Sequence, residues 1–325
     1  MNTIVTDLSA LEYWSVYGPP DEAPSRIRKA PTAINADELG VALSRLHLTP
    51  PIHILVGSPT DRRLLKDIRC HSWSSDLPRS SCIQVSKGVY VATPAFCFKQ
   101  MSQTLDLIDT IILGTELCGG YSTFATSLFK SLDRPILCTP EKLRRFIEAS
   151  SSPQSRSTAA RALPWIMGRS ASPAETILAM RLCLPPKLGS FSFSGAELNA
   201  KVLLPPSVRE MMGSDHYRCD LLWHGAKPHR SRIAIEYDSD LCHSGPRSSD
   251  HDKDRRNHLE HIGIHVISVT KDQLYSIHGL EGIVAQLARA LGKRLRVDSP
   301  AFTWRQNNLF EHLVGKSGIM NVPRR

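Results

Sequence analysis

The amino-acid sequence predicts an α/β protein of two domains. Its 325 residues exceed the ~100–200 residues of one ordinary domain. The C-terminal half alternates helix-type and strand-type patterns, which is typical of layered α/β structure. A small polar segment at 149–159 lies between two helical patterns and marks the best boundary. We expect a smaller α+β domain over 1–150, an α/β domain over 160–295, and a basic C-terminal helix or tail over 296–325.

The N-terminal half begins with a loop over 18–32, which is rich in proline and charge. Helical spacing follows over Ala36–Leu46, and Ile52–Val56 is typical of a short buried strand. Ser81–Thr93 predicts a hairpin that turns at Lys87 and Gly88. Pro94–Leu113 carries an apolar stripe of helical type. No catalytic group of residues stands out in this half.

In the C-terminal half, Ser172 to Glu175 form a capping-box pattern, which starts a helix that runs to about Leu184. Two strands are predicted next, Arg218–Trp223 and Arg232–Asp238. The remaining elements are a polar helix, a strand, a second capping box and an amphipathic helix. Their ranges are Asp250–Ile262, Ile264–Val269, Thr270–Gln273 and Leu280–Leu291.

Composition excludes several classes of protein. An apolar fraction of 41% is enough for real cores, so the chain is neither fully disordered nor collagen-like nor a coiled-coil filament. No run approaches the ~18–20 apolar residues of a membrane helix, and no secretory signal is expected. The eight cysteines include no C-x-x-C pair, which favours reduced, mostly buried thiols and a cytoplasmic location. A disulfide set is the alternative.

Charge is unevenly distributed along the chain. Residues 151–325 hold 24 Lys and Arg against 16 Asp and Glu, whereas residues 1–150 hold 16 against 15. A basic half beside a nearly neutral half indicates that the second half meets a polyanion such as DNA. A basic surface that serves only solubility is the alternative.

Three acidic residues suggest a metal site. Alternation along Arg232–Asp238 puts Glu236 and Asp238 on one face of a strand. If that strand pairs with the one before it, Asp220 and Glu236 converge. Oxygen ligands of this kind suit Mg²⁺ or Mn²⁺, which can activate water and neutralise charge on a phosphodiester. Acids at solvated strand ends are the plainer explanation.

The ordered set of C-terminal segments resembles the PD-(D/E)xK nuclease superfamily, and most closely its very-short-patch-repair (Vsr)-like branch, which includes many bacterial domains of unknown function. The matching stretches are SPAET, YRCDLLW, IAIEYDSDLCH, DKDRRNHLEHIGIHVISVT and DQL, all within residues 172–274. The resemblance implies a restriction-endonuclease-like core, in which helices flank a mixed sheet. It also implies roles for single residues: Asp220 would be the first metal ligand and Glu236 the second. Glu175 would support the metal directly or through water, besides capping its helix.

The resemblance extends to three residues further along. His243 would be a phosphate contact or a proton donor, or else an ordinary loop histidine. Arg255 or Arg256 would bind phosphate, or else form part of a solvated helix face. The superfamily's lysine, two residues after the second acid, is replaced here by Asp238, which leaves catalytic competence open. Lys253 could supply the missing ammonium group, or Asp238 could be a third metal ligand.

The stretch from His53 to Met101 resembles the middle of abortive-infection (AbiEi-type) antitoxin-like proteins, without their usual N-terminal helix-turn-helix. Together these features predict a metal-dependent DNA endonuclease that acts in defence or repair. The first alternative is a catalytically inactive nuclease-fold protein that binds DNA or acts as an antitoxin-like regulator. The second is an interaction protein with an incidental basic surface.

Overall fold

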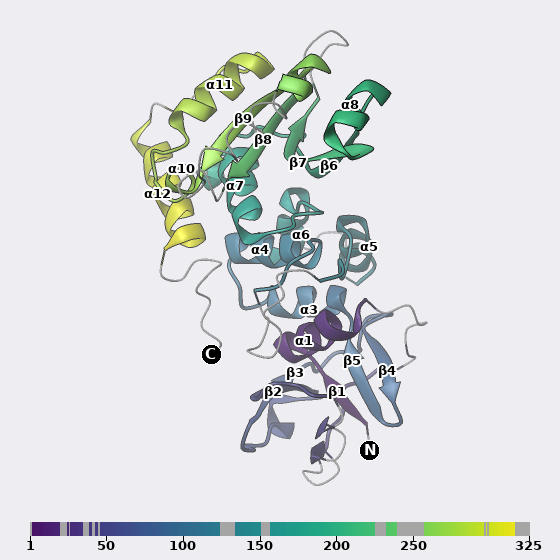
Figure 1. Ribbon diagram of the computed structural model, residues 1–325. Coiled ribbons are helices and arrows are strands. Elements are labelled where there is room, and N and C mark those ends of the chain that lie inside the picture. The colour runs from purple at the N-terminus through teal and green to yellow at the C-terminus, as the bar shows by residue number, and fades with distance from the viewer. Residues whose placement is uncertain are drawn as a thin grey trace. The chain divides into compact units, whose positions relative to one another are not determined.

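The computed structural model describes residues 2–19, 25, 27–34, 39–40, 43–44, 46–123, 134–150, 157–224, 232–238, 257–295, 297 and 299–315. The chain divides into two units, Met1–Gly168 and Arg169–Arg325. Each unit has its own mixed sheet with helices around it, as the α/β prediction requires (Figure 1). The boundary along the chain follows Gly168, C-terminal to the predicted 149–159 segment, because the helix over Thr158–Ala162 packs on helices of the first unit.

The N-terminal unit is built on a five-stranded sheet of order β3-β2-β1-β5-β4. β1 is antiparallel to β2 and parallel to β5, β2 is parallel to β3, and β4 is antiparallel to β5. The strands are β1 (Thr3–Val5), β2 (Ile52–Val56), β3 (Ile68–Ser72), β4 (Cys82–Ser86) and β5 (Val89–Ala92). The helices are α1 (Asp7–Tyr17), α3 (Pro94–Met101), α4 (Leu107–Leu117), α5 (Pro140–Ser150) and α6 (Thr158–Ala162), with short 3-10 turns η1 (Pro59–Asp61) and η2 (Leu163–Trp165).

Several N-terminal predictions are confirmed and one is corrected. The strand over Ile52–Val56 and the β4–β5 hairpin are present. The predicted helix over Pro94–Leu113 is two helices, because the side chain of Asp106 accepts a hydrogen bond from the Asp109 amide at 2.9 Å and caps a new helix. Much of the predicted Ala36–Leu46 helix lies outside the described residues.

The C-terminal unit is built on a four-stranded sheet of order β6-β7-β8-β9. β7 is antiparallel to both of its neighbours, β6 and β8, and β9 runs parallel to β8. The strands are β6 (Glu197–Leu203), β7 (His216–Trp223), β8 (Arg232–Asp238) and β9 (Ile264–Thr270). The helices are α7 (Pro173–Cys183), α8 (Pro206–Met212), α10 (Lys271–Leu274), α11 (Glu281–Leu291) and α12 (Pro300–Val314), with the turn η3 (Pro186–Leu188).

The helix α7 lies at the centre of this unit. All of its residues are buried, and it packs against β7, β8, α10 and α12. Helices begin at both predicted capping sequences, and the capping box is complete at Thr270. At Ser172 the side chain accepts from the Glu175 amide, but the Glu175 carboxylate accepts from the Ala171 amide instead of the Ser172 amide. Of the predicted polar helix Asp250–Ile262, residues 257–261 are described and helical, and Gly263 ends it at φ 78°. The predicted tail contains α12, which buries Phe302, Leu309 and Leu313.

No helix among the described residues is long and apolar enough to cross a membrane. The described cysteines are free, and all but Cys70 are buried.

Candidate active site

The strands β7 and β8 pair, as the sequence reasoning required, but only over a short stretch. Their register joins Leu221 to Ile235, Leu222 to Ala234 and Trp223 to Ile233. Extending this register by one pair sets Asp220 opposite Glu236. Beyond that point, β7 continues its pairing with β6, and β8 continues its pairing with β9. We call this place, where Asp220 and Glu236 follow the last β7–β8 pair, the strand fork.

Asp220 holds the strand fork in place. Its Oδ2 accepts a hydrogen bond from the backbone amide of Tyr237 at 2.7 Å. A side chain of β7 thus binds an amide that a backbone carbonyl would bind in a regular antiparallel ladder. This contact fixes the Asp220 carboxylate between the two strands, beside the stretch of β8 that pairs with β9 and no longer with β7.

Glu236 and Asp238 lie on β8 next to β9. In the parallel register, Glu236 is beside Ser268 and Asp238 is beside Thr270. Both side chains are partly exposed, but the Oε1 oxygen of Glu236 is buried. The two acids alternate with Tyr237 along the strand, so they share a face, as the sequence predicts.

Glu175 comes from the N-terminal turn of α7 and is 8% exposed. Its Oε2 accepts hydrogen bonds from the Ala171 amide at 2.8 Å and from the side-chain amide of Asn199, and its Oε1 accepts one from the Ser172 hydroxyl at 3.1 Å. Burial raises the pKa of Glu175 above its ordinary value, and the negative charge of Asp220 raises it further, against the lowering by these hydrogen bonds. Glu175 is therefore close enough to Asp220 for their charges to interact.

Asn199 is a site residue that the sequence reasoning missed. It lies on β6 with φ 48°, a left-handed conformation that asparagine tolerates better than most residues. Its side chain donates both to the Arg169 carbonyl, at 2.8 Å, and to Glu175. The alternating ELNAKVL pattern of β6 was the available signal, since it is typical of a strand.

The charge of Asp220 acts on Glu175, and the β7–β8 register, extended by one pair, would set Asp220 opposite Glu236. Asp238 lies two residues beyond Glu236 on β8, on the same face of the strand. The predicted His243, Arg255 and Arg256 lie outside the described residues.

In the described part of the C-terminal unit, no three His, Cys, Asp or Glu residues have ligand atoms within 4.8 Å of one another, so Asp220, Glu236 and Glu175 are not drawn together that tightly. The N-terminal unit contains one such trio, formed by Asp7, His53 and His71. Two opposed carboxylates at the strand fork are nevertheless the hard oxygen donors that Mg²⁺ and Mn²⁺ prefer, with water completing the coordination.

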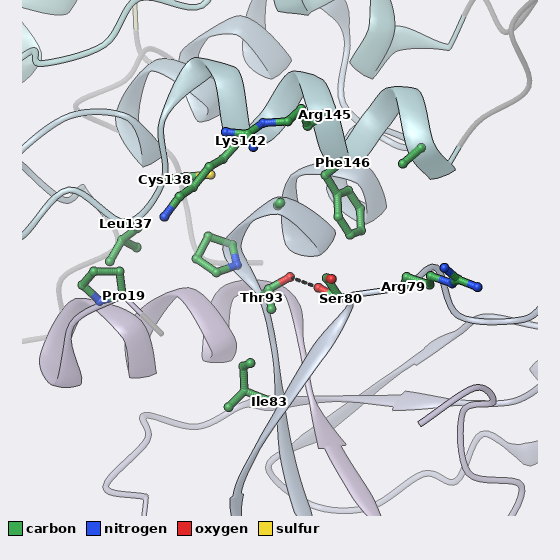
Figure 2. Close-up of a pocket in the computed structure, with 13 residues that line it drawn as sticks. Pro19, Arg79, Ser80, Ile83, Thr93, Leu137, Cys138, Lys142, Arg145 and Phe146 are labelled. Carbon is green, nitrogen blue, oxygen red and sulfur yellow. Dashed lines mark hydrogen bonds between the residues drawn. The ribbon is translucent and has the colours of Figure 1, made fainter. Parts of the chain in front are cut away.

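The N-terminal unit also has a cavity of about 360 Å³. Figure 2 shows Lys142, Arg145 and Phe146 along one side of the cavity. Ser80 and Thr93 lie next to each other on the opposite side. The Thr93 hydroxyl donates to the Ser80 carbonyl at 2.9 Å. Its charged lining residues are cations only, so the cavity favours an anionic ligand with an apolar part.

Comparisons with known proteins identify no relative: no protein-family model, no curated protein sequence and no solved structure matches this chain.

Proposed function

We propose that the C-terminal unit is a metal-dependent DNA endonuclease with its active site at the strand fork. The observation that carries the proposal is the β7–β8 register, whose last pair is Leu221 with Ile235 and whose extension by one pair would set Asp220 opposite Glu236. A strand fork is a place where two backbones separate and carboxylates from both can turn toward one ion or one phosphate. The mixed sheet flanked by helices supports the restriction-endonuclease-like core that the sequence resemblance implies.

Asp220 and Glu236 would hold the Mg²⁺ or Mn²⁺ ion, which when bound supplies an activated water and neutralises charge on the phosphodiester. The Tyr237 amide orients Asp220. Asn199, Ser172 and the Ala171 amide orient Glu175, which would assist through water. Asp238 takes the position of the usual lysine and adds a third carboxylate on the same strand face.

DNA is the proposed substrate because residues 151–325 carry a surplus of eight positive charges. A surface of this sign attracts phosphate backbones without regard to base sequence, and its contribution to binding falls as salt rises. The substrate class follows from this charge together with phosphodiester chemistry at the strand fork.

A catalytically inactive DNA-binding regulator is the second candidate. Asp238 favours it, because the ammonium group that would orient the attacking water is missing from that position. This protein would bind DNA in a salt-dependent way and cleave it in no divalent metal.

The test is whether the full-length protein cleaves supercoiled plasmid DNA and a single-stranded oligonucleotide. Each substrate is incubated with Mg²⁺, with Mn²⁺ and with a chelator. Wild type is expected to nick DNA only with metal, and Glu236→Gln is expected to lower the rate at least about 100-fold. Glu197→Gln is the matched control, since Glu197 is an exposed acid on the same sheet. Equal cleavage by Glu236→Gln and wild type would remove the site. Salt-sensitive binding without cleavage by wild type would establish the regulator instead.

A further inference from the structure

We propose that the N-terminal unit binds one divalent transition-metal ion, of the Zn²⁺ class, through Asp7, His53 and His71. This site is independent of the strand fork. Two imidazoles and one carboxylate are the nitrogen and oxygen donors that zinc and its neighbours accept, and three protein ligands leave a position for water.

Three separate elements bring the trio together. Asp7 opens α1 directly after β1, His53 lies on β2, and His71 lies on β3. The parallel register sets Leu55 beside His71 and His53 beside Arg69, so both imidazoles project from the same face of the sheet. β1 runs next to β2, and the Thr6 amide donates to the His53 carbonyl at 2.9 Å. The sheet itself therefore fixes where all three side chains start.

The distances between the donor atoms match a metal site. His53 Nδ1 lies 3.2 Å from Asp7 Oδ1 and 2.9 Å from His71 Nε2. A tetrahedral ion with bonds of about 2.0–2.1 Å holds its ligand atoms roughly 3.3 Å apart. His71 Nδ1 lies 3.8 Å from Asp7 Oδ2, and the three residues offer ligand atoms that all lie within 4.8 Å of one another. An ion would therefore draw Asp7 and His71 closer together.

Proton counting argues against a purely hydrogen-bonded trio. His53 Nδ1 faces both the Asp7 carboxylate and His71 Nε2. A neutral imidazole has one N–H in total and therefore cannot donate from one nitrogen to both partners with good geometry. If His71 donates to His53 instead, the lone pair of His53 Nδ1 accepts that proton. His53 Nδ1 and Asp7 Oδ1 are then two acceptors 3.2 Å apart with no proton between them. A cation satisfies all three donors at once.

Access and backbone geometry agree with this interpretation. The side chains of His53 and Asp7 are 5% and 13% exposed, whereas His71 is 27% exposed, so the trio opens to solvent at His71. Asp7 has φ 53°, a left-handed conformation that aspartate adopts more readily than most residues, and its Oδ1 accepts a hydrogen bond from the Leu8 amide at 2.7 Å. The carboxylate lies near both histidines, with Oδ1 3.2 Å from His53 Nδ1 and Oδ2 3.8 Å from His71 Nδ1.

One electrostatic effect opposes the ion. The positive charges of Arg69 and Arg62 act on His71 and oppose a cation beside it. The carboxylate of Asp7 offsets part of this positive charge.

The test measures Zn²⁺ affinity of the metal-stripped full chain by competition with a chromophoric chelator, and Co²⁺ binding by visible absorption. Wild type is expected to bind one Zn²⁺ at this site, and His71→Ala to weaken that binding at least about 100-fold. Asp7→Asn is the conservative partner, because asparagine keeps the size and tolerates the left-handed backbone. Zn²⁺ should raise the melting temperature of wild type but not of Asp7→Asn.

Two controls separate this site from others. His278→Ala removes an exposed histidine of the C-terminal unit, and Glu236→Gln disables the strand fork; both should keep wild-type Zn²⁺ affinity. Unchanged affinity in both His71→Ala and Asp7→Asn would overturn the proposal, as would failure of wild type to bind Zn²⁺. Loss of Zn²⁺ binding in Glu236→Gln alone would place the ion at the strand fork instead.

Discussion

The carboxylate of Asp220 binds the backbone amide of Tyr237 at 2.7 Å, where β7 and β8 cease to pair. One side chain therefore has two roles. It takes over a hydrogen bond of the sheet. It also places a negative charge at the position that the extended register sets opposite Glu236.

These two roles can be separated by substitution. Asp220→Asn keeps an oxygen for the Tyr237 amide, so its free energy of unfolding should stay within about 0.5 kcal/mol of wild type, while metal-dependent cleavage is lost. Asp220→Ala leaves that amide without this acceptor and should cost about 1–3 kcal/mol. Urea denaturation of the two variants checks this; equal stability of both would show that the hydrogen bond contributes nothing.

Arg181 provides a test of how α7 is anchored. Its guanidinium, 5% exposed, donates to the Leu274 carbonyl at 2.5 Å and to the Ile277 carbonyl at 2.7 Å. Burial lowers the pKa of Arg181 to about 10, so the group stays charged at pH 7. Arg181→Met should destabilise the protein by about 2–4 kcal/mol, since both carbonyls lose a charged donor.

The matched control is Arg289→Met on the exposed side of α11, where the guanidinium makes one hydrogen bond of 3.3 Å to the Ala285 carbonyl. That change should stay within about 0.5 kcal/mol of wild type. Chemical denaturation of both variants compares them, and similar losses would contradict an anchoring role for Arg181.

Glu116 should make stability depend on pH. It is 1% exposed, and its two carboxylate oxygens accept hydrogen bonds from the amide and hydroxyl of Thr123, each at 2.7 Å. Burial raises the pKa of Glu116 despite these bonds. The folded protein therefore holds the proton more tightly than the unfolded chain, so this contribution to stability is full below the ordinary pKa and is lost as pH rises through the raised value.

The measurement is the difference in free energy of unfolding between wild type and Glu116→Gln across that pH range. Wild type should lose stability relative to the variant as pH rises. Glu148→Gln, which removes an exposed carboxylate of α5, serves as the control. A difference that grows in favour of wild type with rising pH would mean that the pKa of Glu116 is lowered on folding.

Local sequence signals predicted much of the C-terminal unit. The helix caps at Ser172 and Thr270 and the strand β8 depend on neighbouring residues alone, and all three are present, although the reciprocal capping-box bond forms only at Thr270. The β4–β5 hairpin was predictable for the same reason. The break between α3 and α4 was not, because a cap at Asp106 competes with an apolar stripe that continues through it.

Long-range relationships were largely beyond the sequence. That Asp220 faces Glu236 could be proposed from strand pairing, but the Tyr237 contact depends on where the pairing ends. Asn199 joins the site through a side-chain contact between β6 and α7, which are separate in the sequence. Asp7, His53 and His71 are far apart in the chain, and only the strand order of the N-terminal sheet brings them together.

The central claim is that Asp220 and Glu236 share one divalent ion, and anomalous diffraction from crystals soaked in Mn²⁺ tests it most directly. We predict an anomalous peak between the two carboxylates in wild type and its loss in Glu236→Gln crystals of the same form. An ordered strand fork with no peak there, at an Mn²⁺ concentration that supports DNA cleavage in solution, would contradict the account.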